Sequence, residues 1–94
     1  MAAPAGAAGT GALRVSVISP EAKVFEGDAD QVIVPGWDGS MGILRGHAPL
    51  IALLGEGVLR VESGGSSVSF RVRGGFLQVV DNVVTVISEH AEAA

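Results

Sequence analysis

VSFRVR, residues 68–73, alternates apolar and polar side chains without a break. In an extended chain its two valines and its phenylalanine lie on one face, and its serine and two arginines lie on the other. This period of two is typical of a strand with one face on a core and the other in solvent. LRVSV, residues 13–17, repeats the pattern, and VLRVE, residues 58–62, repeats it in part.

Turn-forming residues separate these runs at short intervals. They are Ser19-Pro20, Pro35-Gly36, Asp38-Gly39, Ser63-Gly64-Gly65-Ser66 and Asp81-Asn82. No segment keeps helical spacing for three turns, although residues 49–54 are too apolar to assign by period alone. The pattern therefore predicts about eight to ten short strands. We expect an all-β sandwich or a flattened barrel.

Two segments near the C-terminus are apolar on both faces, FLQVV at 76–80 and VVTVI at 83–87. One interpretation is a pair of central strands with a few exposed valines. The other is that another protein covers the outer face of their sheet. The composition favours the second, because 48% hydrophobic residues and a mean hydropathy of +0.47 are high for 94 residues. No run approaches the roughly 18–20 apolar residues of a membrane-spanning helix.

Charge and size limit the possible functions further. The net charge of −4 offers no basic stripe for nucleic acid. An acidic chain is also repelled by anionic membrane surfaces, so we expect any membrane association to be indirect. The absence of cysteine excludes disulfides and thiolate chemistry. A chain of 94 residues has room for one domain with one core.

The sequence offers little for catalysis, with two histidines, ten carboxylates and no tyrosine. His90 lies near the C-terminus, which leaves His47 alone for a metal site. Asp28 and Asp30 share one side of an extended segment, where edge charges that discourage aggregation explain them better than a catalytic pair. We expect no catalytic residue, no metal and no cofactor. A free-standing β-sandwich that binds a ligand or another protein is the alternative function.

GSMGILRGHAPL, residues 39–50, is the most specific motif. Its glycines permit tight turns, and Pro49 suits an edge strand or the first residues of a strand. The segment resembles the G-x-x-G-I-x-x-G-H-A-P-L signature of the epsilon subunit of F-type ATP synthases, the counterpart of mitochondrial delta. The resemblance continues in order at residues 13–20, 24–27, 74–79 and 82–86, so it covers nearly everything from Leu13 to Ser88.

The resemblance implies a ten-stranded β-sandwich of two antiparallel sheets over residues 13–90. We expect the Ala/Gly-rich residues 1–12 to form a disordered tail and residues 91–94 a short C-terminal tail. Typical bacterial members continue into a helical hairpin that can bind ATP or block hydrolysis. Because the sequence stops at Ala94, we expect no C-terminal helical hairpin here.

The implied function is that of a non-catalytic central-stalk subunit. It would bind the gamma subunit through one sheet and the c-ring through loops, in a complex with alpha and beta subunits, and couple ion-driven rotation to ATP synthesis. Its location would be peripheral, on the cytoplasmic side of the cell inner membrane. Carried over position by position, the implied gamma-subunit contacts are Ser19, His47, Ala52, Arg73, Gln78 and Thr85, and the implied c-ring contacts are Ser40 and Met41.

Overall fold

Ten strands make up most of residues 13–94, the part of the chain that this computed structural model describes. They are β1 (Leu13–Ile18), β2 (Lys23–Ala29), β3 (Gln31–Gly36), β4 (Gly39–Leu44), β5 (Leu50–Leu53), β6 (Glu56–Ser63), β7 (Ser66–Arg73), β8 (Phe76–Val80), β9 (Val83–Ile87) and β10 (His90–Ala93). The tail expected over residues 1–12 lies outside the described residues.

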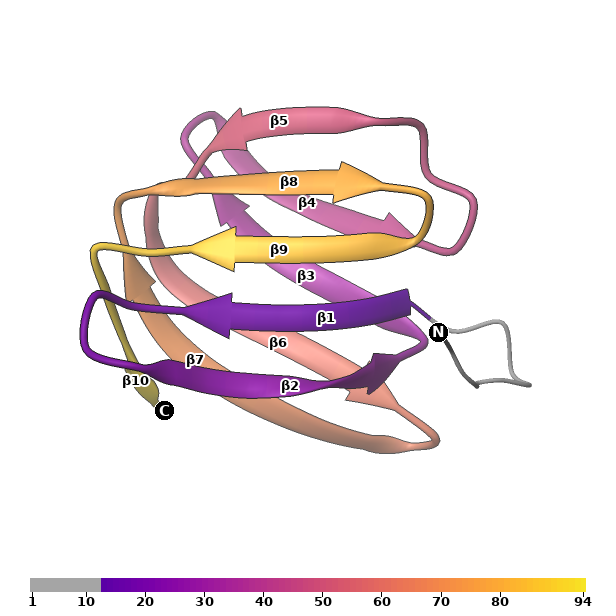
Figure 1. Ribbon diagram of the computed structural model, residues 1–94, viewed down its shortest axis with the longest axis horizontal. Coiled ribbons are helices and arrows are strands. Elements are labelled where there is room, and N and C mark those ends of the chain that lie inside the picture. The colour runs from indigo at the N-terminus through magenta and orange to yellow at the C-terminus, as the bar shows by residue number, and fades with distance from the viewer. Residues whose placement is uncertain (1–12) are drawn as a thin grey trace.

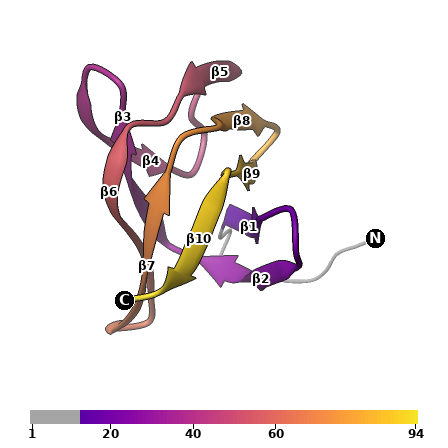
Figure 2. The same cartoon turned by 90° about the vertical axis from the view of Figure 1, so that its left-hand side faces the viewer.

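The strands form two five-stranded sheets that pack face to face (Figures 1 and 2). The front sheet has the order β2-β1-β9-β8-β5, and the back sheet has the order β10-β7-β6-β3-β4. The predicted ten-stranded sandwich is confirmed. One pair departs from the antiparallel expectation, because β1 and β9 run parallel, with Arg14 opposite Val83 and Ile18 opposite Ile87. These two strands are far apart in the sequence, so no hairpin forces them to be antiparallel.

The core lies between the sheets and is built by the alternation seen in the sequence. In β1 every second side chain is fully buried, and in β8 and β9 the same holds for Leu77, Val79, Val84 and Val86. The intervening residues of these strands point out of the sandwich. Sixteen hydrophobic residues from both sheets form one buried cluster in the described part of the chain. The two layers therefore share a single core.

Ser88 marks the place where the chain leaves the front sheet for the back sheet. Its N–H donates to the Ile18 carbonyl at 2.9 Å, and its hydroxyl donates to the His90 carbonyl at 2.6 Å. The same oxygen accepts from the N–H groups of Arg73 and His90 at 3.2 and 3.3 Å. Residues 91–93 consequently pair with β7 as part of β10 and are not the tail that the sequence suggested.

Candidate docking surface

Six large apolar side chains are exposed together on the outer face of the front sheet. They lie on β5, β8 and β9: Ile51 (71% exposed), Leu53 (64%), Phe76 (40%), Val80 (39%), Val83 (45%) and Ile87 (38%). We call these six residues the apolar face. Four further exposed large hydrophobics in the described residues are scattered over other elements: Trp37, Leu44, Val58 and Val68.

Strand register brings the apolar face together. Leu53 lies opposite Phe76, and Phe76 lies opposite Ile87. At the other end of the same strands Val80 lies opposite Val83. Side chains directly opposite each other on one face of neighbouring strands are in contact distance, so the register forms two apolar groups, Leu53-Phe76-Ile87 and Val80-Val83, and Ile51 lies between them opposite Gln78. Exposed apolar residues gathered on one face indicate an interaction site, whereas singly scattered exposed residues do not.

A row of uncharged polar residues crosses the middle of this surface. Gln78 and Thr85 are cross-strand partners, Ile51 lies beside Gln78 on β5, and Ser16 lies beside Thr85 on β1. Gln78 is exposed and Thr85 is half-buried. The two polar side chains therefore lie between the two apolar rows.

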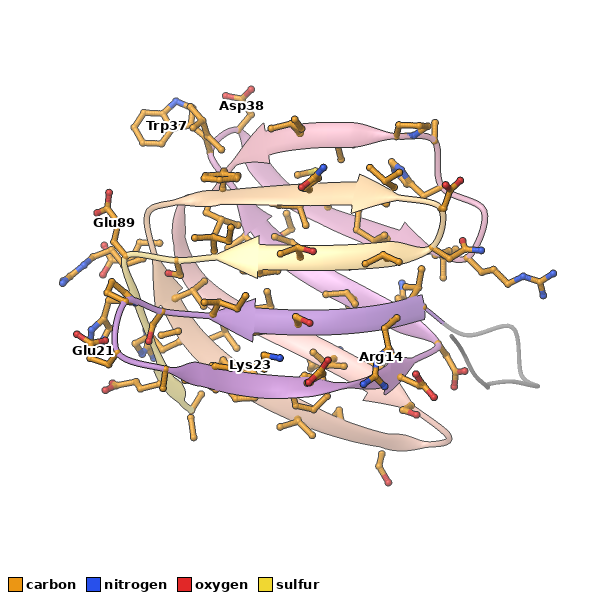
Figure 3. The ribbon with its side chains drawn as sticks, in the orientation of Figure 1. Arg14, Glu21, Lys23, Trp37, Asp38 and Glu89 are labelled. Carbon is orange, nitrogen blue, oxygen red and sulfur yellow. The ribbon has the colours of Figure 1, made fainter. Side chains whose placement is uncertain are left out.

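The other two strands of the front sheet, β1 and β2, carry charged side chains, of which Arg14 and Lys23 are labelled in Figure 3. Arg14 contacts Asp28 at 3.1 Å and Glu26 at 3.4 Å, and Lys23 contacts Glu26 at 2.9 Å. The hydrogen bond to Asp28 raises the pKa of the Arg14 guanidinium, and contact with Lys23 lowers the pKa of the Glu26 carboxyl. All four side chains are well exposed, so solvent weakens each pair.

The turn between β3 and β4 adds an exposed tryptophan at one end of the sandwich. Trp37 is 74% exposed and, like Asp38, projects away from the sheets in Figure 3. The main-chain N–H of Trp37 donates to the Leu53 carbonyl at 3.0 Å, which ties the turn to the end of β5. A notch of about 420 Å³ lies beside it, lined by residues 36–41 and by Ala52 and Leu53. The apolar face and the notch meet at Leu53.

The loop that carries His47 lies at the other end of the apolar face. Its position is set by the β8–β9 turn, because the Gly46 N–H donates to the Asn82 side-chain oxygen at 2.7 Å. The main-chain N–H of His47 donates to the Leu44 carbonyl at 3.2 Å, and the ring Nδ1 lies 2.7 Å from the Ala48 carbonyl oxygen. Since a carbonyl only accepts, Nδ1 is the donor and Nε2 is left available to solvent or to a partner.

The structure brings together only some of the residues that the resemblance assigned to gamma. Gln78 and Thr85 share the apolar face, and His47 is exposed near its border. Ser19 is only 7% exposed, and its hydroxyl donates within the β1–β2 turn. Ala52 lies opposite Leu77 and packs against the core, so its side chain points to the inner side of the sheet.

The remaining predicted contacts lie on the back sheet. Arg73 ends β7 and is exposed, opposite Glu56 on one side and His90 on the other. Ser40 is exposed on β4, and Met41 is half-buried against the core. Ser40 and Met41 both line the notch.

Sequence reasoning missed the two most exposed residues of the apolar face, Ile51 and Leu53. Residues 49–54 were too apolar to assign by period. The residues on the inner face of this strand are apolar as well, so no alternation between apolar and polar residues was visible. The available signal was Pro49, which favours an edge strand immediately before them. An edge strand of a sandwich has one inner face, so every second residue after Pro49 points outward.

Other kinds of site find little support in the described part of the chain. Residues 13–94 contain no group of three or more His, Asp or Glu side chains that could hold a metal ion. No helix among them is long and apolar enough to cross a membrane.

Comparison with known proteins identifies the family. The sequence model of the ATP synthase delta/epsilon chain, beta-sandwich domain, matches residues 12–94. The chain belongs to this family. The ATP synthase epsilon chain of Leptospira borgpetersenii is 47% identical over 78 residues, which cover 83% of this chain and 61% of the relative. That of Frankia casuarinae is 43% identical over 81 residues, covering 85% of this chain and 95% of the relative.

Solved structures share the fold. A chain of the Euglena gracilis mitochondrial ATP synthase superposes with a TM-score of 0.82 at 23% identity, over 99% of this chain and 62% of that one. A chain from the central stalk and c-ring of the Tetrahymena thermophila enzyme gives a TM-score of 0.72 at 18% identity, over 85% and 65%. At these identities the likeness concerns the β-sandwich itself. The chain spans about three fifths of the length of the Leptospira relative.

Proposed function

We propose that this domain is a non-catalytic central-stalk subunit of an F-type ATP synthase that docks onto the gamma subunit through its apolar face. The single observation that carries this is a set of six exposed apolar side chains gathered on the outer face of one sheet of a delta/epsilon-family sandwich. The back sheet has no comparable cluster among the described residues. The domain would join alpha and beta subunits only as part of the same complex.

The role we propose is mechanical. Two hydrogen-bonded sheets on one core form a rigid body, and rigidity is what a part that turns with a rotor requires. Torque is transmitted by a broad, well-packed contact, since a small and wet one would slip. The apolar face spans three adjacent strands and offers such a contact. The domain would thereby couple ion-driven rotation to ATP synthesis.

The c-ring contact is proposed for the β3–β4 turn. Trp37 projects there beside the notch, and Ser40 and Met41 line the same notch. Exposed tryptophans are enriched among the side chains that carry binding energy at interfaces. In this arrangement the domain would lie peripherally at the cytoplasmic side of the cell inner membrane, held there by its partners.

A matched pair of valine substitutions tests the gamma contact. Val83 on the apolar face and Val58 on the back sheet are 45% and 44% exposed, and each has an arginine as a cross-strand neighbour. Val83→Asp is expected to weaken binding to the complex of alpha, beta and gamma subunits (α3β3γ) about tenfold or more, because the interface would bury a carboxylate. Val58→Asp is expected to bind like the wild-type chain. The measurement is titration calorimetry with both variants checked for unchanged thermal unfolding.

Whole-enzyme activity provides the second readout. In ATP synthase reassembled with the Val83→Asp chain, ATP synthesis is expected to fall. ATP hydrolysis by α3β3γ that is detached from the rest of the enzyme is expected to stay unchanged. The proposal is wrong if the wild-type chain does not bind α3β3γ at moderate salt. Equal weakening by both aspartate variants would also reject it, because the contact would then not be specific to the apolar face.

A further inference from the structure

Gln78 and Thr85 interrupt an otherwise apolar surface. They are direct cross-strand partners, with Phe76 and Ile87 on one side and Val80 and Val83 on the other. Their strands β8 and β9, together with β5, contain no charged residue. The centre of the apolar face is therefore polar but uncharged.

This polar pair cannot be covered by just any apolar surface. The exposed Gln78 amide is hydrated in the free chain, where it can donate twice and accept twice. The Thr85 hydroxyl can donate once and accept twice. A partner that removes this water without supplying hydrogen bonds leaves buried polar groups unsatisfied, which weakens binding substantially. The pair thus rejects surfaces that the surrounding apolar residues alone would accept.

Charge on the partner is not called for either. Within the strands of the front sheet, the charged side chains belong to β1 and β2, where Arg14 and Lys23 already contact Glu26 and Asp28. On β1 and β2 these two cations and two carboxylates balance one another. Opposite the uncharged centre, a buried charge on the partner would have no counter-charge and would be expelled.

We propose that Gln78 and Thr85 are specificity-determining residues and that the gamma surface facing them is uncharged and presents hydrogen-bonding groups. Main-chain amides, or amide and hydroxyl side chains, have the required chemistry. The apolar residues around the pair supply contact area, and the pair fixes the register in which that area is used. This inference rests on the proposed docking to gamma.

Three substitutions separate this role from simple apolar contact. Gln78→Leu keeps a similar size and adds apolar surface, so it would tighten binding if the centre only needed to be apolar. We expect it to weaken binding to α3β3γ about tenfold, and Thr85→Val about fivefold. Gln78→Glu adds a charge and is expected to weaken binding at least as much as Gln78→Leu. The control is Gln31→Leu, the same change at a half-buried residue on β3 of the back sheet. It is expected to leave binding unchanged.

Salt dependence tests the absence of charge independently. Affinity is expected to change less than about threefold between roughly 0.1 and 0.5 M NaCl, because uncharged contacts are not screened. Tighter binding by Gln78→Glu, or a steep loss of affinity with salt, would mean a cationic partner surface and would overturn the inference. Equal or tighter binding by Gln78→Leu would overturn it as well.

The outcomes also distinguish this inference from the proposed function. If the wild-type chain fails to bind α3β3γ, the proposed function itself is wrong. If it binds, Val83→Asp disrupts binding and Gln78→Leu does not, then only the inference is wrong. A dimer of the free chain that Gln78→Leu dissociates would assign this face to a second copy of the chain and would likewise overturn the inference. Sedimentation of the free variants measures that last outcome.

Discussion

Gly75 is expected to tolerate no side chain, and replacing it with alanine is a strong test of the described fold. Its φ is +97°, in the region that favours glycine. A Cβ atom there would lie 2.8 Å from the Ser88 Cα and 2.9 Å from the Ile87 carbonyl carbon, and closer still to the Ile87 oxygen. These are backbone atoms of the neighbouring strand, so no side-chain rotation can relieve the overlap.

The adjacent Gly74 supplies a matched control. Its φ is +70°, and its Cβ would meet the Glu89 carboxylate at 2.8 Å. Glu89 is exposed and can swing away. Both alanines incur about 1–2 kcal/mol for the left-handed backbone. Gly75→Ala adds about 1–3 kcal/mol for forcing β8 away from β9, which gives a total of about 2–5 kcal/mol.

That loss is large beside the roughly 5–14 kcal/mol expected for a 94-residue domain. Urea unfolding followed by far-UV circular dichroism measures both variants against the wild-type chain. We expect Gly74→Ala to be the milder change by at least about 1 kcal/mol. If Gly75→Ala is as stable as Gly74→Ala, the close approach between the Gly75 turn and the end of β9 is wrong.

Three further predictions concern the junctions between strands and the charged border. Ser88→Ala removes the acceptor for two N–H groups, so we expect a loss of about 1–3 kcal/mol and faster amide exchange in β10, while Ser88→Thr retains most of both. Asn82→Gly keeps the positive φ of 66° but loses the acceptor for Gly46, so Gly46 amide exchange should rise with little change in unfolding, and Asn82→Asp should restore protection. The lowered pKa of Glu26 means that its contribution to stability is present above its ordinary value of 4.5 and is lost as pH falls through the lowered pKa. Unfolding midpoints at low salt should therefore decline less steeply with acid in Glu26→Gln, and the difference should shrink at high salt; identical pH profiles would contradict the described ion pairs.

Most strands were predictable because their period is set by backbone geometry. Of the three side chains that the alternation in residues 68–73 assigned to the core face, Phe70 and Val72 are buried and Val68 is 44% exposed. Two features depend on distant residues and left no local pattern. β1 and β9 are parallel neighbours because of the order in which the strands are arranged in the sheet. Residues 90–93, HAEA, have little strand propensity and form β10 because β7 and Ser88 supply hydrogen bonds.

The sequence predicted which sheet has the exposed apolar surface, but it did not predict every side chain on that surface. The two-sided strands at 76–80 and 83–87 pointed to an exposed apolar surface, and the structure has one there. Ala52 shows the limit, because neighbours in a strand face opposite sides. Ile51 lies on the apolar face while Ala52 packs inward opposite Leu77. A motif position locates a residue on its strand, and only the register decides which face it occupies.

Exposure by itself does not identify a docking surface; the neighbours of an exposed residue do. Val58 and Val83 are the same residue at almost the same exposure, 44% and 45%. Across the strands Val83 meets Val80 and Arg14, and it shares the outer face of its sheet with five other exposed apolar residues. Val58 lies opposite Arg71 on a sheet where exposed apolar residues are scattered. Water covers an isolated valine at little cost, whereas a continuous apolar surface gains most when a partner covers it. The two sheets share one core, yet among residues 13–94 only the front sheet gathers its exposed apolar side chains on one outer face.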